Sequence, residues 1–323
     1  MSTHAMMQDN SQDSATSTQK AEPDRHWIQA TLFLLALLSA TRYGMRYMFN
    51  FQHGRFPVSS EADVIPWPWI FSNLPHFALG LPFSVTLLAI LLTHEFGHYF
   101  SCRRYGIRAS VPYLLPAPSL GGTAGAIILL KSSVKSRAAL ISIGAIGPIA
   151  GFLVAIATTC IGLILSKPVA IEPQKLVDFQ SPLIFKFLAA LLHVPLGRPL
   201  LWHPILIASW IGILLTSLNL LPAGQLDGGH ILYALSPRLH RIATYAVIAG
   251  LVYLGIEHWA GWLAWAAFLF LPGMRHPTVK DTRPIPPRLL ALVLLAIIVL
   301  LLTAMPEPFT KFSAIDLISK IHH

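Results

Sequence analysis

Residues 84–104 read SVTLLAILLTHEFGHYFSCRR, a long apolar run that ends in a His-Glu-x-x-His cluster and two arginines. On a helix, His94 and His98 lie one turn apart on the same face, so both imidazoles can bind one Zn²⁺. Glu95 lies beside the open coordination position, where a carboxylate can take a proton from water and later deliver it to a leaving amine. A chain of this composition contains the pattern by chance about 0.01 times. Two histidines merely paired with polar neighbours are the alternative, but ionisable clusters inside a span are costly and usually functional.

The composition around this stretch is that of a membrane protein. Charged residues make up 11% of the 323 residues and hydrophobic residues 54%, whereas globular chains have roughly 25% charged residues. A net charge of +9 would suggest nucleic-acid binding in a soluble protein. Here the basic residues lie between apolar runs, which is how multi-pass membrane proteins hold their orientation. We therefore expect the lipid bilayer, and no nucleic acid, as a partner.

Stretches without charged residues indicate six or seven membrane-spanning helices in an all-α membrane protein. Each stretch is long enough, or nearly so, to cross a hydrocarbon layer of about 30 Å. They cover 26–41, 64–94, 138–166, 199–226, 242–256, 258–274 and 289–306. With seven spans and a cytoplasmic N-terminus, most of the 23 Lys and Arg residues would lie inside, which favours this orientation.

A further uncharged stretch, 109–130, is rich in helix breakers. They are Pro112, Pro116, Pro118, Gly121, Gly122 and Gly125. We therefore expect a re-entrant loop or a β-hairpin near 109–131. Irregular backbone at membrane depth is tolerated only where it is buried in protein or lines a wet cavity.

A third metal ligand must come from far along the chain, because no acidic residue follows Glu95 until Glu172. The candidate is Asp227, at the end of the uncharged run 199–226, where a nearby proline and glycine would unwind the helix and let the aspartate turn toward a neighbouring span. In the alternative interpretation, Asp227 caps a helix that begins near Gly228. Both roles can hold together.

Gly147 and Gly151 form a small-xxx-small pattern within an apolar run. Such a face permits close approach of two helices. We interpret the pattern as packing that holds the metal-bearing helices together.

In combination, these motifs resemble the site-2 protease family of intramembrane zinc metalloproteases. The resemblance is to its compact branch without a PDZ domain, which includes bacterial, cyanobacterial and chloroplast members. It spans roughly residues 80–235 and rests on His94 to His98, Gly121 to Ile127, Gly147 to Gly151 and Asn219 to Gly229.

The resemblance implies one Zn²⁺ per chain, bound by His94, His98 and Asp227, with Glu95 as the general base. Asn219 matches the family's asparagine near the active site, and its amide could steady the substrate or the developing oxyanion. The Gly-rich loop corresponds to a β-hairpin that holds an extended substrate by strand addition. Outside the matched motif, His230 is a candidate for orienting a metal ligand.

The implied activity is cleavage of a transmembrane segment of membrane-anchored proteins, as in regulated intramembrane proteolysis. If Arg103 marks the cytoplasmic interface, the helical rise puts His98 roughly 7 Å and His94 roughly 14 Å below it. One alternative is a zinc or proton transporter using the His/Asp site, although no second HExxH-like half is present, as repeat-built transporters would show. The other is an inactive homologue acting as a scaffold, which the intact His/Glu/His/Asp set disfavours.

The expected organisation has five parts. They are a disordered polar tail (1–25), a first transmembrane helix with an outer loop (26–75), a catalytic core (76–235), additional transmembrane helices (236–304) and a C-terminal tail (305–323). Because the first part lacks the Arg-rich, acidic-poor character of a transit peptide, we expect a bacterial cell (inner) membrane rather than an organelle.

Overall fold

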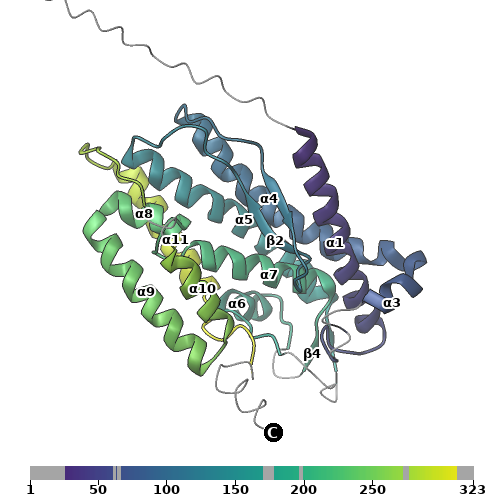
Figure 1. Ribbon diagram of the computed structural model, residues 1–323. Coiled ribbons are helices and arrows are strands. Elements are labelled where there is room, and N and C mark those ends of the chain that lie inside the picture. The colour runs from purple at the N-terminus through teal and green to yellow at the C-terminus, as the bar shows by residue number, and fades with distance from the viewer. Residues whose placement is uncertain are drawn as a thin grey trace, which may run out of the picture.

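The computed structural model of the protein describes residues 26–60, 63, 67–169, 178–195, 199–271 and 276–310. These residues form a mostly helical assembly with two short antiparallel strand pairs (Figure 1). The expected class, an all-α membrane protein with a β-hairpin, is confirmed. The polar tail 1–25 and residues 311–323 of the C-terminal tail lie outside the described residues, and the domain boundaries remain predictions.

Four segments of the described chain are long and apolar enough to cross a membrane. They are α1 (His26–Gln52), the 3₁₀ helix η1 (Leu74–Gly80) with α4 (Leu81–Arg104), α5 (Arg137–Leu165) and α9 (Pro237–Glu257). Shorter apolar helices follow the other uncharged runs, namely α7 (Pro204–Asn219), α10 (Gly261–Phe270) and α11 (Pro287–Thr303). Large apolar side chains such as Leu34, Leu153 and Ile242 are exposed on these helices, as contact with lipid requires.

The remaining elements are short. They are α3 (Trp67–Ser72), β1 (Tyr113–Pro116), β2 (Thr123–Ile127), β3 (Lys167–Pro168), α6 (Leu183–Leu191), β4 (Leu200–Leu201) and α8 (Asp227–Leu235). Of these, the β1–β2 hairpin and α8 position the candidate site.

The centre of the molecule is formed by α4, α5 and α7, which pack against one another (Figure 1). Glycines set the spacing of these helices: a Cβ on Gly97 of α4 would lie 2.8 Å from the Cα of Gly147 on α5. A Cβ on Gly212 of α7 would lie 2.8 Å from Ile90 Cγ2 on α4. In lipid, helices associate through close packing of this kind, because apolar surface alone gives little driving force. The packing interpretation of the Gly147 motif is therefore confirmed.

Helix α1 continues past its uncharged run and buries the two arginines that follow this run, Arg42 and Arg46. The Arg46 Nε donates to Asp63 Oδ1 at 2.6 Å, and Asn50 Nδ2 donates to the same oxygen at 3.1 Å. The other carboxylate oxygen accepts from the backbone N–H groups of Ser59 and Ser60 at 2.9 and 2.8 Å. Burial raises the pKa of Asp63, but the hydrogen bonds and the nearby arginine outweigh it and hold the pKa at about 2. An ionised carboxylate thus ties the segment that follows α1 to this helix.

The stretch of prolines and glycines forms the hairpin of β1 and β2, in which Tyr113 lies opposite Ile127. The pairing register shifts between Leu115 and Pro116. Of the two expectations, a re-entrant loop or a hairpin, the structure has the hairpin.

The hairpin packs against α1. Tyr47 Oη donates to the Leu120 carbonyl at 2.7 Å. Gly122 has a φ of +70°, and a Cβ there would lie 2.5 Å from Ala40 Cα. Only glycine combines this conformation with so close an approach. The turn of the hairpin is therefore seated on α1, while β2 contacts α4.

Candidate metal centre

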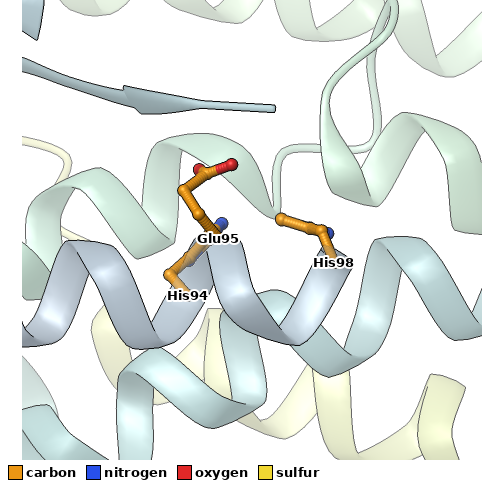
Figure 2. Close-up of side chains that lie close together, drawn as sticks. All are labelled: His94, Glu95 and His98. Atoms are coloured by element: carbon orange, nitrogen blue, oxygen red, sulfur yellow. The ribbon is translucent and has the colours of Figure 1, made fainter. Parts of the chain in front are cut away.

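The His-Glu-x-x-His cluster lies on α4 in the middle of the protein. Figure 2 shows the three side chains projecting from neighbouring turns of this helix. His94, Glu95 and His98 are only 5, 7 and 5% exposed, and one ligand atom from each lies within 4.8 Å of the others. The backbone of Ile128, just beyond β2, interacts with the Glu95 carboxylate. The hairpin therefore borders the site on the side of Glu95.

Asp227 reaches this cluster from 133 residues further along the chain. It is the first residue of α8, and its Oδ2 lies 3.2 Å from His94 Nε2 and 3.4 Å from His98 Nε2. A zinc ion with bonds of 2.0–2.1 Å to tetrahedral ligands separates those ligand atoms by about 3.3 Å. Two imidazole nitrogens and a carboxylate oxygen are also ordinary zinc ligands. The residues present fit a zinc ion in both spacing and chemistry.

Helix α5 orients His98. The Nδ1–H of His98 donates a hydrogen bond to the Ile143 carbonyl oxygen at 2.8 Å, which leaves a lone pair on Nε2 for a metal. One turn later, a Cβ on Gly147 would overlap the His98 imidazole. A Cβ on Gly151 would lie 3.0 Å from His94 Cβ. The glycines of α5 therefore make room for both histidines as well as for helix packing.

Asn219 is the last residue of α7, and its Nδ2 lies 3.4 Å from His94 Nε2. The structure therefore brings together all five of the site residues expected from the sequence, His94, Glu95, His98, Asn219 and Asp227. They come from α4, α7 and α8.

Two contributors were not expected. The Ile143 carbonyl carries no signal in the sequence, because every residue has a backbone carbonyl. His230, a candidate for orienting a metal ligand, interacts electrostatically with Asp227 and His98, and its Nδ1 also lies 2.9 Å from Nε2 of His276, which was not expected. His276 follows α10 and belongs to none of the motifs recognised in the sequence.

Residues 82–256 match the family model described as "Peptidase family M50". The match covers more than half of the chain and includes all five residues of the site. The chain belongs to peptidase family M50, the family of site-2 proteases, so the resemblance noted from the motifs is confirmed.

Two relatives come from Arabidopsis thaliana. "Probable zinc metalloprotease EGY1, chloroplastic" is 28% identical over 299 residues, which are 86% of this chain and 53% of the relative. "Probable zinc metalloprotease EGY2, chloroplastic" is 30% identical over 247 residues, 74% of this chain and 44% of the relative. The chain thus spans about half the length of these curated relatives. Both names describe those relatives as probable zinc metalloproteases.

Among solved structures, "Site-2 Protease from Methanocaldococcus jannaschii" aligns with 68% of this chain and 92% of its own, with 15% sequence identity and a TM-score of 0.37.

Proposed function

We propose that this chain is an intramembrane zinc endopeptidase that hydrolyses a peptide bond in a transmembrane segment of membrane-anchored proteins, as in regulated intramembrane proteolysis. The observation that carries the proposal is the convergence of His94 Nε2, His98 Nε2 and Asp227 Oδ2 at 3.2 and 3.4 Å. This convergence lies among helices long and apolar enough to span a membrane. A protease site in such a place acts on substrates that are themselves in the membrane.

His94, His98 and Asp227 would hold one zinc ion per chain. When bound, zinc supplies the Lewis acidity that makes water nucleophilic near neutral pH and polarises a scissile carbonyl. The protein contributes the orientation of the ligands, above all through the hydrogen bond from His98 Nδ1 to the Ile143 carbonyl.

Glu95 is the proposed general base. Its carboxylate takes the proton of the attacking water and delivers it to the leaving nitrogen, which converts a poor leaving group into a neutral amine. The residue is 7% exposed, so bulk water does not compete for this proton transfer.

Asn219 and the hairpin are the proposed substrate-facing groups. The Asn219 amide, 3.4 Å from His94 Nε2, would donate a hydrogen bond to the developing oxyanion. The β2 strand pairs with β1 on one edge and contacts α4. An extended substrate could therefore add to the hairpin beside Glu95, since a strand edge exposes unpaired backbone groups.

The expected setting is a cell (inner) membrane with the N-terminus in the cytoplasm. The distribution of Lys and Arg between the apolar runs supports this orientation. The names of the relatives place those proteins in the chloroplast, so the kind of membrane remains a prediction.

The test compares wild type with Glu95→Gln, reconstituted in vesicles with a model transmembrane substrate, while bound zinc is measured. Loss of cleavage with zinc retained is expected, because glutamine keeps the shape of the side chain and removes the base. Unchanged cleavage would remove Glu95 from the mechanism. If wild type does not cleave the substrate, and both wild type and Glu95→Gln carry zinc into the vesicles, a transporter is favoured. If wild type shows no cleavage and no zinc flux, a scaffold is favoured.

A further inference from the structure

The first turns of α5 contact both ends of α8, and the two helices pack against each other. At one end, a Cβ on Gly144 of α5 would lie 2.5 Å from the carbonyl oxygen of Asp227. At the other end, Arg137 Nε donates to the Ala234 carbonyl at 2.5 Å, and its Nη2 donates to the Leu235 carbonyl at 3.1 Å. The two contacts are about two helical turns apart on each helix, so α5 and α8 are antiparallel.

The Arg137 guanidinium closes the C-terminal end of α8. The last four carbonyls of a helix have no partner within the helix, and they carry partial negative charge that a nearby cation stabilises. A guanidinium presents its donors in a rigid planar fork, whereas an ammonium is a point charge on a flexible stem. Because Arg137 bonds two successive carbonyls, it fixes the rotation of α8 as well as its position.

Arg137 is itself held by Asp281, in the segment between α10 and α11. Asp281 Oδ2 accepts from Arg137 N at 3.0 Å, and Asp281 Oδ1 accepts from Arg283 Nε at 2.9 Å. Ser136, which precedes α5, makes no side-chain cap hydrogen bond to the described residues. A carboxylate from 144 residues away therefore takes the place of the usual helix cap. This residue lies beyond the family match at 82–256.

The segment that carries Asp281 also packs against α8 and α9. The Tyr233 ring of α8 stacks on His276 with ring centres 3.8 Å apart at 12°. His240 of α9 has its ring centre 5.5 Å from that of His276. Val279 N donates to Tyr233 Oη at 3.4 Å. The end of α8 opposite Asp227 is therefore held from two sides, by α5 and by this segment.

We propose that Arg137, braced by Asp281, is a positioning residue that holds Asp227 at the metal centre by way of α8. The inference rests on the proposed function, in which Asp227 is a zinc ligand. The rise of a nine-residue helix puts Asp227 about 12 Å from Leu235, so α8 is short enough for a displacement at one end to move the other. Helix α5 also holds His98, through the Ile143 carbonyl. The first turns of α5 thus orient ligands that come from two other helices.

The first test measures zinc affinity by competition with a chelator, together with the kcat and KM of cleavage, for the full chain in detergent. Loss of a group that orients a metal ligand lowers metal affinity or activity by about 10–100-fold. Because Arg137 acts over two helical turns, Arg137→Gln should lower zinc affinity and kcat by about tenfold each. KM should not change, because the hairpin is untouched.

Arg238→Gln is the matched control. Arg238 is exposed and lines the same cavity of about 510 Å³ as Arg137 and Asp281, but within the described residues it donates no hydrogen bond to α8. This variant has the same change of charge and should keep the zinc affinity and kcat of wild type. Equal zinc affinity and kcat in the two variants would overturn the proposal. Wild type that neither binds zinc nor cleaves would instead contradict the proposed function itself.

A second measurement separates positioning from a general loss of stability. Co²⁺ bound in place of zinc absorbs visible light in a band that depends on the arrangement of its ligands. At saturating Co²⁺, this band should differ from that of wild type in Arg137→Gln and not in Arg238→Gln. An unchanged band with a lower unfolding temperature would make Arg137 a residue that only stabilises the fold, which overturns the proposal.

Asp281 keeps the test decisive if Arg137→Gln does not fold. Asp281→Ala removes the acceptor of Arg137 N and should lower zinc affinity, whereas Asp281→Asn keeps an acceptor oxygen and should lower it less. Zinc affinity equal to that of wild type in Asp281→Ala would overturn the proposal.

Discussion

Gly147→Ala tests how α5 positions the proposed zinc ligands. The added methyl would overlap the His98 imidazole and lie 2.7 Å from its Cδ2. The ring atoms Cε1 and Nε2 would lie closer still, and ordinary contact begins at 3.4 Å, so the ring would have to retreat by about 1 Å. It cannot do so freely, because its Nδ1 is hydrogen-bonded to the carbonyl of Ile143 on the same helix, at 2.8 Å.

The expected effect falls on function more than on stability. Overpacking a buried site costs about 1–3 kcal/mol, and the better helix propensity of alanine offsets up to about 1 kcal/mol of this. Weakened support of a metal ligand typically lowers metal affinity by about 10–100-fold. A displacement approaching 1 Å in the site can lower the rate by about 100-fold. We therefore expect zinc affinity to fall by about 10–100-fold and kcat/KM by about 100-fold.

The assay measures zinc affinity by competition with a chelator, cleavage of a transmembrane substrate, and thermal unfolding. Gly250→Ala is the matched control, because Gly250 is a helical glycine of α9 with no atom within 4 Å of the added Cβ. It should leave all three quantities unchanged or slightly raise stability. Normal zinc affinity and cleavage in Gly147→Ala would refute the steric account of His98.

Three other substitutions probe the hairpin, the segment that follows α1 and the amide beside the site. Gly122 has a φ of +70° and lies against Ala40, so Gly122→Ala should raise KM about tenfold while the zinc content is unchanged. The control Gly54→Ala, at φ +67° in open space, should leave KM unchanged. Equal effects of the two substitutions on KM would point to backbone strain alone. The pKa of Asp63 is about 2, below its ordinary 3.8, so the ionised carboxylate contributes about 2 kcal/mol to the free energy of unfolding above pH 4. This contribution is lost as the pH falls toward 2, and thermal unfolding of wild type should show the loss. The same loss in Asp63→Asn would contradict the assignment. Asn219→Ala should lower kcat by about 10²–10³-fold with zinc retained, and loss of zinc instead would make Asn219 a residue that orders the metal site.

The local part of the site could be predicted because helical spacing alone puts His94 and His98 on one face. Asp227 could be predicted as well, since acidic residues are scarce and this one ends a long uncharged run. Asn219 stood out only through resemblance to a family. The Ile143 carbonyl and His276 could not be predicted, because backbone groups have no sequence signature and the partners of His276 lie 46 and 36 residues away.

The fold shows the same division between local and long-range information. Prolines and glycines indicated a break in the helical pattern near 109–131, but the pairing of Tyr113 with Ile127 and the register shift beside Pro116 depend on contacts between strands. Charge counting ended the first span at residue 41, whereas α1 continues to Gln52. The helix buries both Arg42 and Arg46, and Arg46 forms an ion pair with Asp63, a contact that local sequence patterns do not predict.

The most direct test of the central claim is the position of the cut. Wild type and Glu95→Gln are reconstituted with a substrate that has one transmembrane helix, and the products are identified by mass spectrometry. Cleavage by wild type within the apolar segment, toward the end that faces Arg103 of the enzyme, and none by Glu95→Gln, is the predicted result. A cut only in the water-exposed flanks of the substrate, or the same cut by Glu95→Gln, would contradict intramembrane hydrolysis at this site.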